Sequence, residues 1–129
     1  MTTHAPKIFI VDDEPLLTTM LNDYLQERNA ALDIHSFATG EACLEELDQQ
    51  PDLVVLDYYL NAREKEAANG IEILRAIKEQ NKALPVIMLS SQQSYGTAAR
   101  TIQYGAIHYV IKSQDAFAEI YDIIKANVS

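Results

Sequence analysis

Four short apolar runs in this sequence each end in residues that could hold a cation or contact a phosphoryl group. The residues that close these runs are Asp12 and Asp13, Asp57, Ser90 and Lys112. Together they supply carboxylates, a hydroxyl and an ammonium group. Carboxylate oxygens are preferred ligands of Mg²⁺, which proteins often place between carboxylates and phosphates. If these side chains meet, the sequence predicts a pocket for a divalent cation and a phosphoryl group.

The apolar runs have the length and composition of buried strands in a parallel sheet. They cover residues 8–11, 53–56, 86–89 and 108–111. Because open α/β sheets place their sites at the carboxyl ends of the strands, we expect the closing residues to converge there. Acidic residues 12–14 could by themselves simply favour the positive end of a following helix. The polar ends of the other strands favour a shared site instead.

Helical periodicity separates the strands. Apolar residues recur at steps of three and four over residues 15–28, 70–77 and 116–124, and a short amphipathic stretch runs from residue 40 to residue 50. These segments predict helices that each bury one face. Residues 32–37 alternate between apolar and polar, which is typical of an edge strand.

The weakest helical pattern lies at residues 92–104. Its apolar anchors would be Ala98, Ala99, Ile102 and Tyr104. It also contains Gly96, which costs a helix interior about 1 kcal/mol relative to alanine. We therefore expect this helix to be the least firmly held, with Gly105 as its C-cap.

The alternation of strands and helices predicts an α/β fold, a doubly wound five-stranded parallel sheet with right-handed crossovers. Residues 8–11 are wholly apolar, so this strand belongs inside the sheet, whereas residues 32–37 belong at its margin. This favours the flavodoxin-like (βα)5 arrangement with strand order 2-1-3-4-5. Residues 1–129 match the size of a single domain.

Composition argues against several other classes of protein. Cys43 is the only cysteine, so neither an intrachain disulfide nor a C-x-x-C site is available. The net charge of −9 argues against direct contact between this domain and nucleic acid. No run approaches the roughly 18–20 apolar residues of a membrane span, and no signal-peptide pattern opens the chain. We expect a cytoplasmic protein without membrane contact.

The ordered set of polar and small residues resembles the receiver domain of bacterial two-component response regulators, the CheY-like family. The matching residues are Val11, Asp12, Asp13, Glu14, Leu56, Asp57, Gly70, Leu89, Ser90, Gly105, Ala106, Tyr109 and Lys112. Each is common alone, but the set in this order is specific and covers essentially the whole chain. The resemblance implies phosphorylation by a histidine kinase or a histidine phosphotransfer protein, and action on a downstream target or output domain.

The resemblance also implies a role for each charged site residue. Asp57 would be the phosphoacceptor. Asp13 and Asp57 would bind Mg²⁺ directly, with Mn²⁺ as an alternative, and Asp12 would bind it through a water. The backbone carbonyl of Tyr59 would supply a further oxygen. Lys112 would pair with the phosphoryl oxygens as a mobile point charge.

A second group of residues would respond to phosphorylation of Asp57. By resemblance, the Ser90 hydroxyl would donate to a phosphoryl oxygen, with Ser91 beside it. Tyr109 would turn inward as Ser90 moves. The helix expected at residues 92–104 would be the bistable element, so that partner binding changes across this helix, the strand at residues 108–111 and the helix at residues 116–124. Such a protein is a switch rather than an enzyme, with at most self-catalysed phosphorylation and autodephosphorylation.

The sequence departs from the family pattern around the site. Ser113 follows Lys112 where the family usually has proline after a cis bond. Since a non-proline cis bond costs about 3–4 kcal/mol, we expect the Lys112–Ser113 bond to be either trans or strained. Residues 61–69 lengthen the loop after the acceptor strand, and could form a helical turn over the site or a partner contact. Ser91 and the bulky Tyr59 could slow the access of water or of a phosphoryl donor.

Two other functions stay open on the sequence alone. A pseudo-receiver, which binds a partner without being phosphorylated, is favoured by Ser113 and the altered loop. A haloacid-dehalogenase-type phosphatase also uses a strand-end aspartate and Mg²⁺, but it needs a second aspartate two residues on, where this chain has Tyr59. The chain is either a stand-alone regulator or the amino-terminal part of a longer protein.

Overall fold

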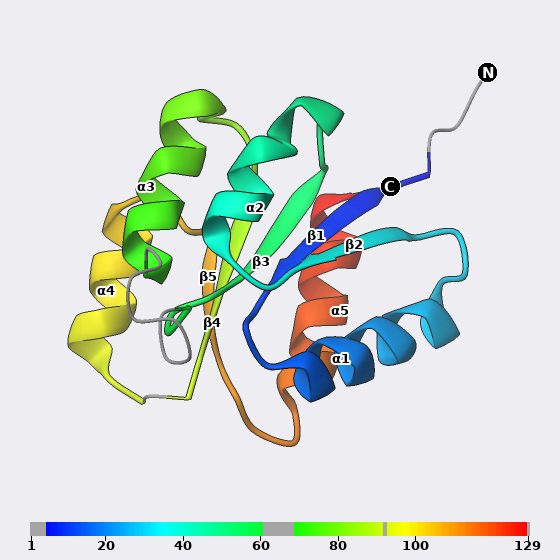
Figure 1. The fold of residues 1–129 in the computed structure, drawn as a ribbon. Coiled ribbons are helices and arrows are strands. Elements are labelled where there is room, and N and C mark those ends of the chain that lie inside the picture. The colour runs from blue at the N-terminus through cyan, green and yellow to red at the C-terminus, as the bar shows by residue number, and fades with distance from the viewer. Residues whose placement is uncertain (1–4, 61–68, 92, 129) are drawn as a thin grey trace.

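Five parallel strands form one sheet in the order β2-β1-β3-β4-β5 (Figure 1). The computed structural model describes residues 5–60, 69–91 and 93–128. The strands are β1 (Lys7–Val11), β2 (Asp33–Phe37), β3 (Leu53–Asp57), β4 (Val86–Ser90) and β5 (His108–Ile111). The predicted fold class and strand order are confirmed, with the half-exposed β2 at one margin.

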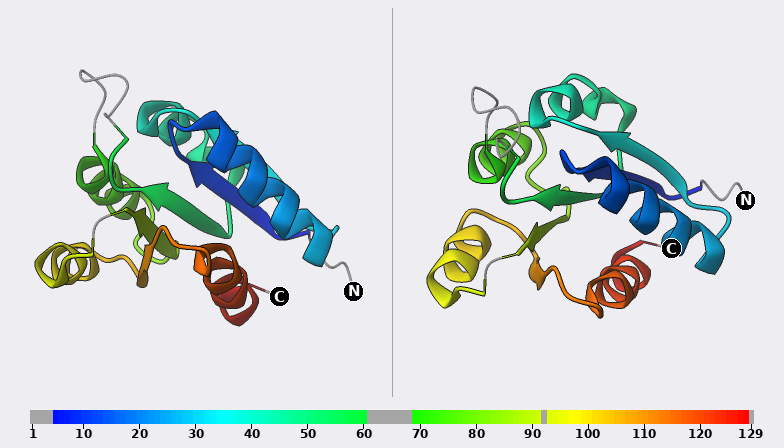
Figure 2. Two further views of the ribbon diagram at one scale, coloured as in Figure 1. Left: turned by 90° about the horizontal axis from the view of Figure 1, so that it is seen from below. Right: turned by 60° about the horizontal axis from the view of Figure 1, so that its bottom comes forward.

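Helices cover both faces of the sheet, as expected for a doubly wound fold (Figure 2). They are α1 (Pro15–Arg28), α2 (Gly40–Glu45), α3 (Gly70–Gln80), α4 (Tyr95–Gln103) and α5 (Ala116–Asn127), with a 3₁₀ turn η1 (Leu47–Gln49) after α2. Helices α1 and α5 lie on one face, whereas α2, α3 and α4 lie on the other. None of the helices described is long and apolar enough to cross a membrane.

The core consists of two apolar layers, because successive strand side chains point to opposite faces. Ile8 and Ile10 of β1 pack in the layer beneath α1 and α5. Phe9 and Val11 pack in the layer beneath α2 and α3. Strands β3 and β4 are buried along their whole length, which explains why their sequences are apolar without alternation.

Side chains at the helix starts account for several element boundaries. Asn69 and Glu72 form a reciprocal capping box at the start of α3. The Ser94 hydroxyl accepts a hydrogen bond from the Thr97 N–H at 3.2 Å, so α4 begins at Tyr95 rather than at residue 92. At the other end of α4, Gly105 has φ +110°, as expected for the glycine that ends a helix.

The predicted anchors of α4 were partly wrong. The buried side chain of this helix is Thr101, whereas Ile102 is 46% exposed and Ala99 is exposed. The prediction was right for the other two anchors, since Ala98 and Tyr104 are half-buried. Positions 98, 101 and 104 therefore form the inward side of the helix, at the three-residue spacing of one helix face. Thr101 tolerates burial because its hydroxyl donates to the Ala98 carbonyl at 2.9 Å.

Candidate functional site

The polar ends of the strands meet at one edge of the sheet, as the sequence predicted. Asp12 and Asp13 follow β1, Asp57 ends β3, Ser90 ends β4 and Lys112 follows β5. The register places Val11 beside Leu56, Asp57 beside Leu89, and Ser90 beside Ile111. Neighbouring parallel strands end at the same edge of the sheet, so residues separated by up to about a hundred positions in the sequence share one site.

Four carboxylates lie at the centre of this edge. Asp12, Asp13, Glu14 and Asp57 each offer one oxygen, and these oxygens lie within 4.8 Å of one another. Asp12 and Asp57 are only 3% and 2% exposed, and Asp13 is also buried. The Oδ2 atom of Asp12 is buried without a hydrogen-bond donor in the described structure. A buried set of oxygen donors fits a hard divalent cation such as Mg²⁺.

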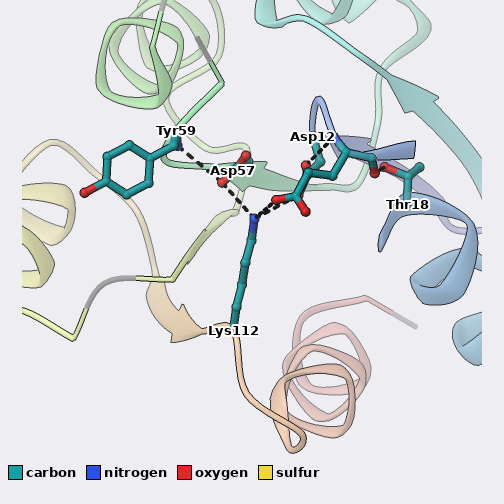
Figure 3. A network of polar contacts seen from close by, with 6 residues as sticks. Asp12, Thr18, Asp57, Tyr59 and Lys112 are labelled. Carbon is teal, nitrogen blue, oxygen red and sulfur yellow. Dashed lines mark hydrogen bonds and ion pairs between the residues drawn. The ribbon is translucent and has the colours of Figure 1, made fainter. Parts of the chain in front are cut away.

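Lys112 reaches this cluster from the end of β5 (Figure 3). Its Nζ lies 3.0 Å from Glu14 Oε1, 3.4 Å from Asp57 Oδ1 and 3.5 Å from Asp12 Oδ2. The backbone N–H of Lys112 donates to the Ser90 carbonyl at 2.8 Å, which fixes where the side chain leaves the sheet. The ammonium group therefore sits against the predicted acceptor carboxylate and two of its acidic neighbours.

The electrostatics of the cluster show an excess of negative charge. Burial, together with the charge of Asp57, raises the pKa of Asp12 from 3.8 to about 6. Burial also raises the pKa of Asp57, against the opposing effect of Lys112. Burial lowers the pKa of Lys112, but the charges of Asp57, Asp12 and Glu14 outweigh this and raise it above its ordinary value. The lysine thus stays charged at neutral pH, and additional positive charge would favour full ionisation of the acids.

Backbone groups hold the acidic side chains in place. The Tyr59 N–H donates to Asp57 Oδ1 at 3.2 Å, and the Glu14 N–H donates to Asp12 Oδ1 at 2.8 Å. Gly70 packs closely against the end of the acceptor strand, where a Cβ would lie 2.6 Å from the Asp57 carbonyl oxygen, and its N–H donates to the Tyr58 carbonyl at 3.0 Å. The start of α3 therefore supports the turn that follows Asp57.

The remaining predicted residues surround the cluster at different depths. Ser90 is fully buried at the end of β4, whereas Ser91 is exposed. Tyr109 is half-buried on β5 and lines a hollow of about 220 Å³ together with Tyr95 and Ala98 of α4. The roles predicted for these three residues stay predictions.

Tyr59 does not cover the acceptor with its ring. Its ring points away from Asp57 (Figure 3) and stands edge-on to the Tyr58 ring, with 4.8 Å between centroids. The Tyr59 side chain is 38% exposed. The expected obstruction by this bulky side chain is therefore not evident in the geometry, and the role of its carbonyl in metal binding stays a prediction.

The departures from the family pattern have different outcomes. The Lys112–Ser113 peptide bond is trans, one of the two predicted alternatives. Lys112 nevertheless points into the site, so the absence of proline at residue 113 does not turn it away from Asp57. The predictions for residues 61–68 lie outside the described part of the chain. Asn69, at the end of that stretch, is the N-cap of α3.

Glu14 is a site residue that the sequence analysis noted as part of the matching set but gave no role in the site. The sequence placed it in an acidic start of helix α1, but its carboxylate is the nearest of the three that surround Lys112 Nζ. The sequence could have indicated this role, because Glu14 directly follows Asp13 at the carboxyl end of β1.

Comparison with known proteins shows which family the sequence matches. The family model described as "Response regulator receiver domain" matches residues 8–125. The chain is 32% identical over 110 residues to the transcriptional regulatory protein ResD of Bacillus subtilis (strain 168), covering 85% of this chain and 43% of ResD. It is 31% identical over 107 residues to the alkaline phosphatase synthesis transcriptional regulatory protein PhoP of the same strain, covering 82% of this chain and 42% of PhoP.

Solved structures show the same fold. The BeF3-activated DrrB receiver domain superimposes with a TM-score of 0.81 at 27% identity, covering 95% of this chain and 97% of that one. A CheY-like receiver domain protein from Methanospirillum hungatei JF-1 has a TM-score of 0.81 at 19% identity, covering 95% and 93%, which supports the fold alone. The chain spans less than half the length of the curated relatives described above.

Proposed function

Because the chain belongs to the response regulator receiver domain family, we propose that it is a phosphoacceptor switch in which Asp57 receives a phosphoryl group. The donor would be a histidine kinase or a histidine phosphotransfer protein. The observation that carries this proposal is the placement of Lys112 Nζ 3.4 Å from Asp57 Oδ1, inside a buried cluster of carboxylates. That arrangement provides an acceptor oxygen beside a cation.

The side chains suggest how the transfer proceeds. A carboxylate oxygen of Asp57 attacks the phosphorus atom, and the bond from phosphorus to the donor nitrogen breaks, with its electron pair left on that nitrogen. The product is an acyl phosphate on Asp57. Phosphoryl transfer depends mainly on positioning and on the stabilisation of charge, and Lys112 can follow the phosphoryl oxygens by leaving Glu14.

A divalent cation completes this scheme. Asp12, Asp13 and Asp57, with the carbonyl of Tyr59, would hold Mg²⁺ or Mn²⁺, and the ion would offset charge on the phosphoryl oxygens. We further propose that the phosphorylated state alters the surface formed by α4, β5 and α5, through Ser90 and Tyr109. On this proposal the domain is a cytoplasmic switch that binds a downstream protein or output domain, and it is not itself an enzyme.

Phosphate incorporation tests the proposal. Purified protein is incubated with acetyl phosphate and Mg²⁺, and intact-mass spectrometry measures the addition of one phosphoryl group. Incorporation is expected for the unaltered chain and for Asp115→Asn, which removes an exposed carboxylate at the start of α5. Asp57→Asn should abolish it.

The possible results separate the three functions. If a folded, Mg²⁺-treated protein accepts no phosphoryl group from acetyl phosphate or from a histidine kinase, the pseudo-receiver alternative replaces the proposal. Turnover of a phosphate ester would favour the phosphatase alternative. Undiminished incorporation in Asp57→Asn would exclude Asp57 as the acceptor.

A further inference from the structure

A groove runs between α3 and α4, and one end of it lies at Tyr58, the residue that follows Asp57. Two adjoining hollows of about 500 and 710 Å³ form it, and both are lined by Arg75 and Glu79 of α3. Tyr58 and Arg100 line the first hollow, and Tyr104 lines the second. The two helices lie side by side on the same face of the sheet (Figures 1 and 2).

The groove has a charge opposite to that of the whole chain. Four of the ten basic residues line it, but only two of the nineteen acidic residues do so. The basic residues are Arg75, Lys78, Lys82 and Arg100, and the acidic residues are Glu72 and Glu79. Since the chain carries a net charge of −9, this groove is a local basic patch on an acidic molecule.

Three of the basic side chains are available to an anionic ligand. Arg75, Arg100 and Lys82 are exposed, and in the part of the chain that the structure describes none of them forms an ion pair with a carboxylate. The Arg75 guanidinium lies 4.9 Å from the centroid of the Tyr104 ring, an arrangement that restrains it without using its hydrogen-bond donors.

Lys78 has a structural role instead. Its ammonium group donates to the carbonyls of Lys82 and Leu84 beyond the end of α3. Its aliphatic stem packs over Gly105, where an added Cβ would meet three of its carbon atoms at 3.2 to 3.3 Å. Lys78 thus supports the floor of the groove, and Arg75, Arg100 and Lys82 stand along its sides.

We propose that this groove docks an acidic, extended segment of a partner protein, with Arg75 as the central anchor. A guanidinium group can bind a carboxylate through two parallel hydrogen bonds. Helix α3 has 11 residues and is therefore about 16 Å long, which matches about five residues of extended peptide. Separated cations interrupted by Glu72 and Glu79 suit spaced carboxylates better than a continuous phosphate backbone. None of the groove residues named here takes part in the proposed phosphoryl transfer, so this inference goes beyond the proposed function.

Nuclear magnetic resonance can locate such binding even when it is weak. A hexaglutamate peptide is titrated into ¹⁵N-labelled protein, and hexaglutamine serves as the uncharged control. Hexaglutamate should shift the amide signals of α3 and α4 in a saturable manner, and added salt should weaken the binding.

Matched variants then test the anchors. Arg75→Gln with Arg100→Gln should weaken hexaglutamate binding about tenfold, because two charge-assisted contacts are lost. Arg28→Gln with Lys125→Gln removes the same charge from α1 and α5 and should change binding less than about twofold. Circular dichroism checks that all variants are folded.

Several results would overturn the proposal. These are the absence of saturable shifts, shifts spread over basic residues elsewhere, equal weakening in the two double variants, and equal binding of hexaglutamine. Tighter binding of a six-residue thymidylate oligonucleotide would assign the groove to phosphates rather than to an acidic peptide.

Discussion

At the scale of single residues, the site is defined by competition for one ammonium group. Lys112 Nζ lies within 3.5 Å of oxygens from Glu14, Asp57 and Asp12. A divalent cation bound to Asp12 and Asp57 would compete with Lys112 for the same oxygens. Glu14, whose side chain is 56% exposed, offers the lysine a partner at the mouth of the site. Glu14 should therefore favour metal binding by drawing Lys112 outward.

A double-mutant cycle tests this competition. Lys112→Met should raise Mg²⁺ affinity, since it removes the competing cation. Glu14→Gln should lower Mg²⁺ affinity by about two- to threefold, as expected for a partly exposed ion pair worth on the order of 0.5 kcal/mol. Isothermal titration calorimetry in the single and double variants measures the coupling between the two residues.

The background in which Glu14→Gln is measured decides its interpretation. If Glu14 acts through Lys112, the effect of Glu14→Gln should be clearly smaller when residue 112 is methionine. Asp23→Asn, an exposed change on α1, should have little effect in either background. An equal effect of Glu14→Gln with and without Lys112 would show that the charge of Glu14 acts on Mg²⁺ affinity directly and not through Lys112.

The buried acids should make stability depend on pH when Mg²⁺ is absent. The pKa of Asp12 is raised from 3.8 to about 6, chiefly by burial. Between about pH 4 and 6 the native state therefore binds more protons than the unfolded state, so the free energy of unfolding should fall as the pH rises through this window. Urea denaturation in EDTA at a series of pH values measures this slope.

Asp12→Asn provides the matched comparison. It should flatten part of that slope and raise the free energy of unfolding at pH 7 by on the order of 1 kcal/mol, since it removes one of the crowded negative charges. Some slope should persist because burial also raises the pKa of Asp57. Stability that increases with pH over the same window would contradict the assignment.

At the scale of helices and strands, two glycines should respond to the same substitution in opposite directions. A Cβ on Gly70 would lie 2.6 Å from the Asp57 carbonyl oxygen and 2.7 Å from the Tyr58 Cα. Because these are backbone atoms, Gly70→Ala should destabilise the protein by about 1–3 kcal/mol and reduce phosphate incorporation.

Gly96 gives the contrasting case. A Cβ there would meet only the Ser94 hydroxyl oxygen, at 3.9 Å. Gly96→Ala should therefore stabilise α4 by up to about 1 kcal/mol, through helix propensity and reduced freedom of the unfolded chain. Thermal unfolding followed by circular dichroism measures both variants. Similar losses in the two would show that the close approach at Gly70 is not what makes its substitution harmful.

The elements that sequence predicted well are those whose burial is complete. The runs that became β3 and β4 are apolar because both faces are covered, so their ends, and with them Asp57 and Ser90, could be placed from composition alone. The spacing of α3 and α5 likewise predicted their buried faces.

The misses arose where tertiary contacts decide the outcome. In α4, Thr101 rather than Ile102 is buried, because packing of the helix beside β5 decides which side faces inward, and the Thr101 hydroxyl can donate to the Ala98 carbonyl of its own helix. The ion pair of Glu14 and Lys112 joins residues 98 positions apart, and no local pattern encodes it. The direction of Lys112 was equally undetermined, since it depends on the carboxylates that surround it.

At the scale of the whole molecule, the acidic cluster exists only when the sheet is formed. Asp13 follows β1 and Asp57 ends β3, so unfolding separates the predicted ligands. The basic groove between α3 and α4 likewise joins residues from two helices. A cation bound at the strand ends should therefore act on global stability, because it binds the native state and not the unfolded chain.

Magnesium should accordingly raise the unfolding free energy of the whole domain. At a free concentration one hundred times the dissociation constant, the expected gain is about 2.7 kcal/mol. Urea denaturation measured with Mg²⁺, and with Na⁺ at matched ionic strength, checks the gain. It should be larger above about pH 6, where Asp12 ionises.

The ligand residues should decide whether this gain is present. Asp13→Asn and Asp57→Asn should each remove most of it, whereas Asp115→Asn, at the start of α5, should keep it. Both ligand variants relieve charge repulsion, so they should be at least as stable as the unaltered chain in EDTA and differ from it chiefly in their response to the metal. Equal magnesium stabilisation in all three variants would place the cation elsewhere and would remove the basis for phosphoryl transfer at Asp57.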